Sequence, residues 1–144
     1  MTQTVSQNLS SGLEDYIEAI YTAELSNEPL KGAELARKLN ISRASVSEAL
    51  SKLVNKKLIT YSSYQTITLT QEGKTEAQKV YEKHNILKNF FESVLDINSE
   101  EAGENACKIE HIISENILDK MKKLTKFFQN HKKILDIYIE ESEK

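Results

Sequence analysis

The chain has 144 residues, 28% of them charged and 39% hydrophobic, with a formal net charge of −3. It has one cysteine and no apolar run near the roughly 20 residues of a membrane-spanning helix, which excludes an internal disulfide framework and an integral membrane protein. Residues 1–8 lack a basic segment followed by an apolar one, so we expect a cytoplasmic protein without a signal peptide. One proline and four glycines favour a mainly helical fold.

The small net charge conceals a strong asymmetry along the chain. Residues 1–30 contain five acidic residues and no lysine or arginine, whereas residues 31–60 contain seven basic residues against two acidic ones. A basic block in an otherwise acidic chain indicates a local site for a polyanion, although charge alone would favour a solvated helix face.

The first predicted helix covers about residues 11–26, with Ser10 or Ser11 as its N-cap and apolar residues recurring at helical spacing. Asp15 and Glu18 are three residues apart and therefore lie on one side of this helix. Acids in a first turn usually interact with the helix dipole, and they are also oxygen ligands suited to a metal.

A helix-turn-helix is predicted next, from a short helix over residues 32–39 and a second helix over 42–55. Asn40 tolerates the left-handed conformation of a tight helix end, and Ser42 is a good N-cap for the second helix. Small and hydrogen-bonding residues on the exposed face of the second helix suit a DNA major groove. We expect DNA contacts from Ser42, Arg43, Ala44, Ser45, Ser47, Glu48 and Lys52.

Two strand-like segments, residues 58–61 and 66–69, follow the second helix and are joined by residues 62–65. A strand pair directly after a helix-turn-helix is typical of a winged DNA-binding domain, so Tyr64 and Gln65 of the connecting loop are further candidate DNA contacts. Thr70 is the expected N-cap of a long helix over about residues 71–95.

Candidate metal ligands lie in the second half of the chain. The run 105–122 has no glycine or proline and has apolar residues at helical spacing, which predicts a helix. On that helix Cys107, Glu110 and His111 would stand at i, i+3 and i+4 on one face. A thiolate, a carboxylate and an imidazole together suit a divalent transition metal. The ordinary interpretation is a small core residue, a solvated acid and a surface histidine, and His84 on the long helix is likewise more often surface or core.

Short helices are predicted beyond this run, over residues 119–128 and 132–143. A domain boundary is expected near residue 72, within the long helix. It separates a winged-helix DNA-binding domain, residues 1–72, from a helical domain, residues 73–144.

Three separated motifs carry a resemblance to a known family. They are Leu13–Tyr21 (LEDYIEAIY), Val80–His84 (VYEKH) and Ala106–His111 (ACKIEH), and the winged domain lies between the first two. With these residues the chain resembles the diphtheria toxin repressor and manganese transport regulator family of metal-activated transcription regulators, over nearly its whole length.

The resemblance implies a mainly α fold, with an N-terminal winged helix-turn-helix and a two-stranded wing, followed by an all-helical dimerisation domain. It implies a non-enzymatic repressor that controls metal homeostasis, and a homodimer that binds double-stranded operator DNA. Carried over position by position, the metal ligands it implies are Asp15, Glu18, His84, Cys107, Glu110 and His111.

The ligand positions combine two branches of that family. The carboxylates Asp15 and Glu18 resemble manganese-type members, whereas Cys107 resembles iron-type members. Lys88 and Gly103 stand where the iron-type ancillary site has ligands, so the resemblance favours His84 in the main site. Because a thiolate favours iron(II) over manganese(II), we expect iron(II), with manganese(II) as the alternative. The recognition-helix residues depart from those of relatives, so the operator sequence does not carry over.

Three other functions suit parts of the chain. A winged-helix regulator could answer to a small organic ligand and have no regulatory metal. A zinc hydrolase would need a carboxylate base at H-E-x-x-H spacing, which the sequence lacks. A protein-interaction module could use the winged fold without DNA, but the basic block of residues 31–60 argues against it.

Overall fold

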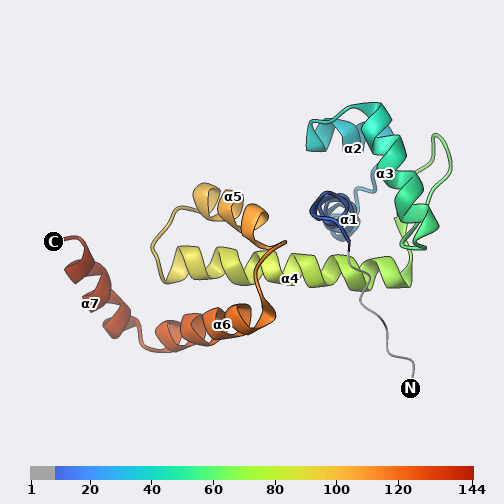
Figure 1. Cartoon of the computed structure of the whole chain (residues 1–144). Coiled ribbons are helices and arrows are strands. Elements are labelled where there is room, and N and C mark those ends of the chain that lie inside the picture. Colours follow the sequence, from blue (N-terminus) through green and yellow to red (C-terminus); the bar gives the residue numbers. More distant parts are fainter. Residues whose placement is uncertain (1–8) are drawn as a thin grey trace, which may run out of the picture. The chain divides into compact units, whose positions relative to one another are not determined.

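The computed structural model describes residues 9–144, and its mainly helical course is shown in Figure 1. The predicted absence of a signal peptide concerns residues 1–8, which lie outside the described residues. Cα packing divides the chain into two compact units, with the division between Lys79 and Val80 inside a long helix. Within the described part of the chain, every helix is too short or too polar to cross a membrane.

The first unit contains the predicted helix-turn-helix. Its helices are α1 (Ser11–Leu25), α2 (Gly32–Leu39) and α3 (Arg43–Asn55). The predicted caps are confirmed, because Ser10 accepts a hydrogen bond from the amide of Leu13 and Ser42 accepts one from that of Ser45. Asn40 ends α2 with a φ of 53°, a left-handed conformation that asparagine adopts at low cost. Local sequence signals therefore set the starts of α1 and α3 and the end of α2, whereas α2 begins after Lys31, whose side chain makes no capping hydrogen bond.

The wing is smaller than predicted. Its strands are β1 (Ile59–Thr60) and β2 (Thr68–Leu69), which pair antiparallel with Ile59 opposite Leu69. The expected longer strands are wrong because the middle of the second segment pairs elsewhere: Thr66 forms an isolated bridge with Lys31, and the amide of Ile67 donates to the carbonyl of Leu30 at 2.8 Å. The loop before α2 therefore replaces part of β1 as the hydrogen-bonding partner.

A carboxylate of α1 completes the wing. Glu24 Oε1 accepts a hydrogen bond from the backbone amide of Leu69 at 2.9 Å, across 45 residues of sequence. The core beneath this contact includes fully buried Ile17, Leu35 and Leu53, from each of the three helices. Helix α1 is thus joined to the wing both by apolar packing and by a polar contact.

The long helix α4 (Gln71–Ser93) begins in the first unit and continues into the second. Thr70 Oγ1 accepts a hydrogen bond from the amide of Gly73, which confirms the predicted cap. The other helices of the second unit are α5 (Ser99–Ile109), α6 (Glu115–Asn130) and α7 (Lys132–Ser142). A core formed by Leu87, Ala106 and Leu118 joins α4, α5 and α6.

The single helix expected over residues 105–122 is wrong. Helix α5 ends at Ile109, Glu110 is its C-cap, and α6 starts after Ser114, whose side chain accepts a hydrogen bond from the amide of Ile117. The apolar spacing continues across the break because both helices turn apolar side chains toward the same core. The observed architecture otherwise confirms the predicted fold class, a winged helix-turn-helix followed by a helical domain.

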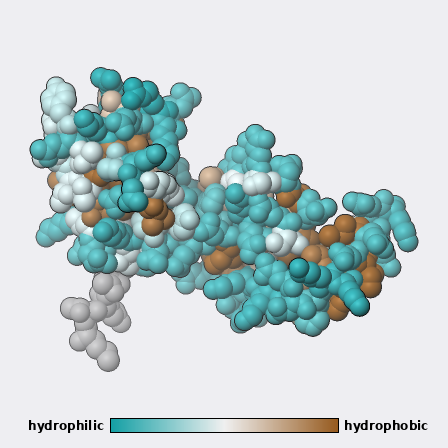
Figure 2. Space-filling model, turned by 180° about the vertical axis from the view of Figure 1, so that it is seen from behind, coloured by the Kyte–Doolittle hydropathy of each residue, from teal (hydrophilic) through white to brown (hydrophobic). Residues whose placement is uncertain are grey.

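Hydrophobic surface gathers on the C-terminal helices, which Figure 2 shows in brown. Helix α7 has no buried residue, and Ile137 is 56% exposed. The other large apolar side chains exposed on α6 and α7 are Ile117, Leu124, Phe127, Ile134 and Tyr138. Because a contiguous apolar surface of this kind is unusual on a monomer, it indicates an interface with another protein chain.

Candidate metal centre and nucleic-acid interface

The candidate metal centre is built around a buried carboxylate in the second unit. The side chain of Glu110 is fully buried at the end of α5, and its Oε2 lies 2.8 Å from Nδ1 of His84 on α4. The His84 side chain is 17% exposed. The ring N–H of the histidine donates to the carboxylate. The ordinary interpretation of Glu110 as a solvated acid is therefore wrong.

The thiol of Cys107 adds a third ligand atom. Its Sγ lies 3.7 Å from Nδ1 of His84, and ligand atoms of His84, Cys107 and Glu110 all lie within 4.8 Å of one another. Atoms bound to one ion by bonds of about 2.0–2.3 Å lie roughly 3–4 Å apart, so this spacing suits a single metal ion. Cys107 is exposed, which opposes its interpretation as a small core residue.

His111 lies in the turn that follows α5, and its side chain is 8% exposed. Its Nε2 is 3.6 Å from Oε1 of Glu110, so two imidazoles flank the two oxygens of one carboxylate. The sequence predicted His111 on one face of a continuous helix, whereas in the structure the helix has already ended and His111 lies in a turn.

The remaining oxygen of Glu110 tests whether a cation fits these residues. Oε1 is buried and accepts no hydrogen bond from any residue between 9 and 144. A buried acceptor without a partner costs about 1–3 kcal/mol, so a cation bound there would remove a penalty that the protein otherwise bears. Nitrogen, oxygen and sulfur donors together are the set that first-row transition metals bind. The residues therefore fit such a metal.

Asp15 and Glu18, the other predicted ligands, lie one turn apart on α1 in the first unit. Their participation in the metal centre stays a prediction. Their neighbour Tyr16 has a raised pKa, caused first by burial and then by the Glu48 carboxylate, so its hydroxyl stays neutral at ordinary pH.

All of the residues predicted to contact DNA are exposed. On α3 and its cap they are Ser42, Arg43, Ala44, Ser45, Ser47, Glu48 and Lys52, and in the wing loop they are Tyr64 and Gln65. The Lys52 ammonium lies 3.2 Å from the Glu48 carboxylate one turn earlier, so these two charges partly offset each other. Tyr64 is 93% exposed, with a left-handed φ of 67° at the end of the wing.

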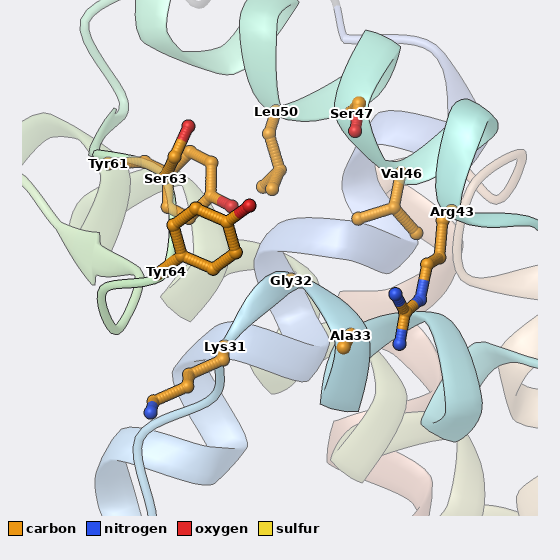
Figure 3. A pocket seen from close by; sticks show the side chains of 10 residues that line it. All are labelled: Lys31, Gly32, Ala33, Arg43, Val46, Ser47, Leu50, Tyr61, Ser63 and Tyr64. Carbon is orange, nitrogen blue, oxygen red and sulfur yellow. The ribbon is translucent and has the colours of Figure 1, made fainter.

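A cavity of about 340 Å³ lies between α2, α3 and the wing (Figure 3). Tyr61, Ser63 and Tyr64 form its wing side, and Arg43 lies across from them. Sequence reasoning missed Tyr61, Ser63 and Lys31 of this lining; the basic block was the only signal that pointed to Lys31. The cavity combines two basic groups with several hydroxyls, which are donors suited to phosphate oxygens.

Comparisons with known proteins agree with this geometry. Residues 8–67 match the family profile "Iron dependent repressor, N-terminal DNA binding domain", and residues 70–138 match "Iron dependent repressor, metal binding and dimerisation domain". An HTH-type transcriptional regulator of Methanocaldococcus jannaschii is 39% identical over 115 residues, which are 79% of this chain and 92% of the relative.

Two further relatives are named as regulators, and one of them is named as a manganese regulator. The HTH-type transcriptional regulator MntR of Listeria welshimeri is 28% identical over 124 residues, covering 86% of this chain and 87% of that protein. The solved structure of the manganese regulator SloR superimposes with a TM-score of 0.70 at 27% identity. That match covers 80% of this chain and 54% of the SloR chain, so this chain spans about half the length of that structure.

Proposed function

Because the chain belongs to the iron-dependent repressor family of metal-dependent transcriptional repressors, we propose that a divalent metal at His84, Cys107, Glu110 and His111 activates it for binding to operator DNA. Asp15 and Glu18 complete the ligand set in this proposal. Residues 1–72 form the DNA-binding domain and residues 73–144 the metal-binding and dimerisation domain. Binding to chromosomal DNA implies that the protein acts in the cytoplasm.

The observation that carries this proposal is the buried, incompletely hydrogen-bonded carboxylate of Glu110. It lies beside the His84 imidazole at 2.8 Å and the His111 imidazole at 3.6 Å. An exposed acidic cluster would be common without a metal, but a fully buried carboxylate with one unsatisfied oxygen needs a partner.

The proposed mechanism follows from linkage. A bound divalent metal supplies positive charge that offsets several carboxylates at once. When Asp15 and Glu18 share the site with Glu110, their mutual repulsion is neutralised, which favours the arrangement in which α1 is held at the helical domain. A ligand shifts such an equilibrium only by its difference in affinity for the two arrangements. Without metal, the three carboxylates repel one another, and the DNA-competent arrangement is less populated.

The same proposal assigns the nucleic-acid interface. Helix α3 enters the major groove with the seven predicted residues, which run from its N-cap Ser42 to Lys52 in its last turn. Tyr64 and Gln65 contact the duplex from the wing. In a homodimer, two such helices about 34 Å apart would match successive major grooves of a palindromic operator. The exposed apolar surface of α6 and α7 is the surface we propose for the partner subunit.

Iron(II) is the metal we favour, with manganese(II) as the alternative. The Cys107 thiolate is a soft donor, which iron(II) accepts more readily than manganese(II) does. Asp15 and Glu18 favour manganese(II) instead, and the similar solved structure of a manganese regulator makes that alternative a concrete one.

A gel-shift assay with a fragment of the protein's own promoter tests the proposal. We expect retarded DNA with iron(II) or manganese(II), and free DNA when a chelator removes the metal. His111→Ala should abolish the response, while Lys144→Ala, a matched change at an exposed position, should leave it intact. Equal retardation with and without chelator would show that no metal activates this chain.

A further inference from the structure

A second site lies in the helical unit, on a groove of about 500 Å³ between α4 and α6, which run alongside each other in Figure 1. The groove is lined by Asn85, Ile86 and Asn89 of α4 and by Lys122, Thr125, Lys126, Gln129 and Asn130 of α6. Its volume is in the range of sites for small molecules, about 300–1,000 Å³. None of the described lining residues is acidic.

The charge of this groove opposes that of the unit around it. Residues 80–144 contain thirteen acidic residues and ten lysines, and six of these lysines fall between positions 120 and 133, where there is no acidic residue. Lysine is therefore concentrated on α6 and the start of α7, although the unit as a whole is acidic. A local excess of positive charge within an acidic unit indicates a site for an anion.

Two of these lysines are available inside the groove. Lys123 is already engaged, because its ammonium lies 2.8 Å from Asp119 and its hydrogen bond lowers the pKa of that carboxyl. Lys122 exerts a weaker attraction on the same carboxyl, but neither Lys122 nor Lys126 forms an ion pair with any residue between 9 and 144. They stand at i and i+4, so the side chains leave neighbouring points on one helix face, about 5–6 Å apart at Cβ.

The walls and floor supply the remaining contacts that a small molecule needs. Asn85 and Asn89 face the lysines from α4, and each carboxamide both donates and accepts hydrogen bonds. The floor is formed by Ile86 and by Thr125, which is 3% exposed and whose hydroxyl already donates to the carbonyl of Met121. The groove thus has two cations at its rim, polar amides on both sides and an apolar base.

We propose that this groove binds a small multivalent anion, either a phosphate or a di- or tricarboxylate, as a second ligand of the protein. Two adjacent ammonium groups recognise two negative charges, and the carboxamides bind the remaining oxygens. Lys122 and Lys126 are exposed, but they are the only charged residues that line the groove among the described residues, so two adjacent charges favour a small anion over an extended polyanion. The proposal goes beyond metal-dependent repression and uses none of the metal ligands.

The groove also lies apart from the apolar surface proposed for dimerisation. Lys122 and Lys126 are each two residues from Leu124, which at about 100° per residue places them roughly 200° around the helix from that exposed side chain. A partner subunit that covers Leu124 would therefore leave the groove open to solvent. On α4, however, Asn85 directly follows His84, so an anion bound here would contact the segment that also carries a metal ligand.

Side-chain amide NMR signals of the metal-free 144-residue chain test this directly. The probes are inorganic phosphate and citrate, with glycerol as the neutral control, in the absence of DNA. We expect one of the two anions to give saturable shifts of the Asn85 and Asn89 carboxamide signals, and the stronger probe identifies the source as phosphate or carboxylate. Glycerol should cause no shift.

Matched charge variants make the result specific. Lys122→Gln combined with Lys126→Gln should lower the affinity for the anion by at least about tenfold, which corresponds to about 1.4 kcal/mol of binding free energy. Lys120→Gln combined with Lys132→Gln removes the same charge outside the groove and should change affinity little. The proposal fails if neither anion gives saturable shifts, or if both double variants weaken anion binding equally. Because no metal is present, none of these results bears on metal activation.

Discussion

Replacing Glu110 by glutamine should stabilise the metal-free protein and remove its response to metal. The Glu110 side chain is fully buried, its Oε2 accepts from His84 at 2.8 Å, and its Oε1 accepts no hydrogen bond from a described residue. Glutamine has nearly the same shape, and its carbonyl oxygen can still accept from His84. The substitution removes a buried charge, and the amide nitrogen that replaces Oε1 can donate to Nε2 of His111, which lies 3.6 Å from that position. The unsatisfied oxygen that it replaces carries a penalty of about 1–3 kcal/mol.

The expected size follows from that penalty. A gain of about 1–3 kcal/mol in the metal-free form corresponds to a rise of roughly 2–12 °C in Tm, using about 2–4 °C per kcal/mol for a chain of this length. With metal the order should reverse. Free metal at one hundred times its Kd adds about 2.7 kcal/mol to the wild type, and Glu110→Gln should lose most of that gain because a charged ligand is missing.

The assay is thermal unfolding of both proteins at one fixed protein concentration, with chelator and with anaerobic iron(II) or manganese(II). Glu104→Gln, on the exposed side of the same helix, is the matched control and should stay within about 0.5 kcal/mol of the wild type in both conditions. Two results would refute the reasoning. The first is that the Glu110→Gln protein is less stable than the wild type in chelator. The second is that it gains as much stability from metal as the wild type does.

Four further substitutions have clear expected outcomes. Arg43→Ala and Lys52→Ala should each weaken operator binding with unchanged metal affinity and lower the salt dependence by about one charge, which salt-titrated gel shifts would measure; an unchanged slope in both would place α3 away from the DNA. Cys107→Glu should move activation from iron(II) toward manganese(II) in anaerobic metal titrations; a native protein that already answers to manganese(II) at lower free concentration contradicts the choice of iron(II). Gly73→Ala should cost about 1–3 kcal/mol in thermal unfolding, since its Cβ would lie 1.9 Å from a backbone oxygen; Gly12→Ala, with open space around it, should not destabilise the fold.

The helix-turn-helix could be predicted closely because its signals are local. Ser42 caps α3 and Asn40 ends α2, and each depends only on neighbouring residues. The wing strands were overestimated because β propensity does not tell which segment will be the partner. Thr66 pairs with Lys31, which lies 35 residues earlier, and no periodicity reports such a pairing.

The candidate metal centre shows the same limit. Periodicity placed Cys107 and Glu110 on one helix face, but it could not bring His84 to them across more than 20 residues; only the family resemblance indicated that. The break after Ile109 was also missed, although Ser114 followed by Glu115 is a recognisable start of a helix. Apolar spacing persisted through the turn, because the same core receives side chains from both sides of it.

The hydrogen bond from the Leu69 amide to the Glu24 carboxylate couples the position of α1 to that of the wing. Glu24 lies six residues beyond Glu18 on the same helix, roughly 9 Å along its axis. If α1 shifted while β2 stayed in place, the buried amide of Leu69 would lose its acceptor, so the helix and the strand should travel together. The amide proton of Leu69 is therefore a natural reporter. Its hydrogen-exchange rate depends on whether the hydrogen bond to Glu24 is formed. A slower rate with metal than without it would show that metal binding stabilises the contact between α1 and the wing in the DNA-binding unit.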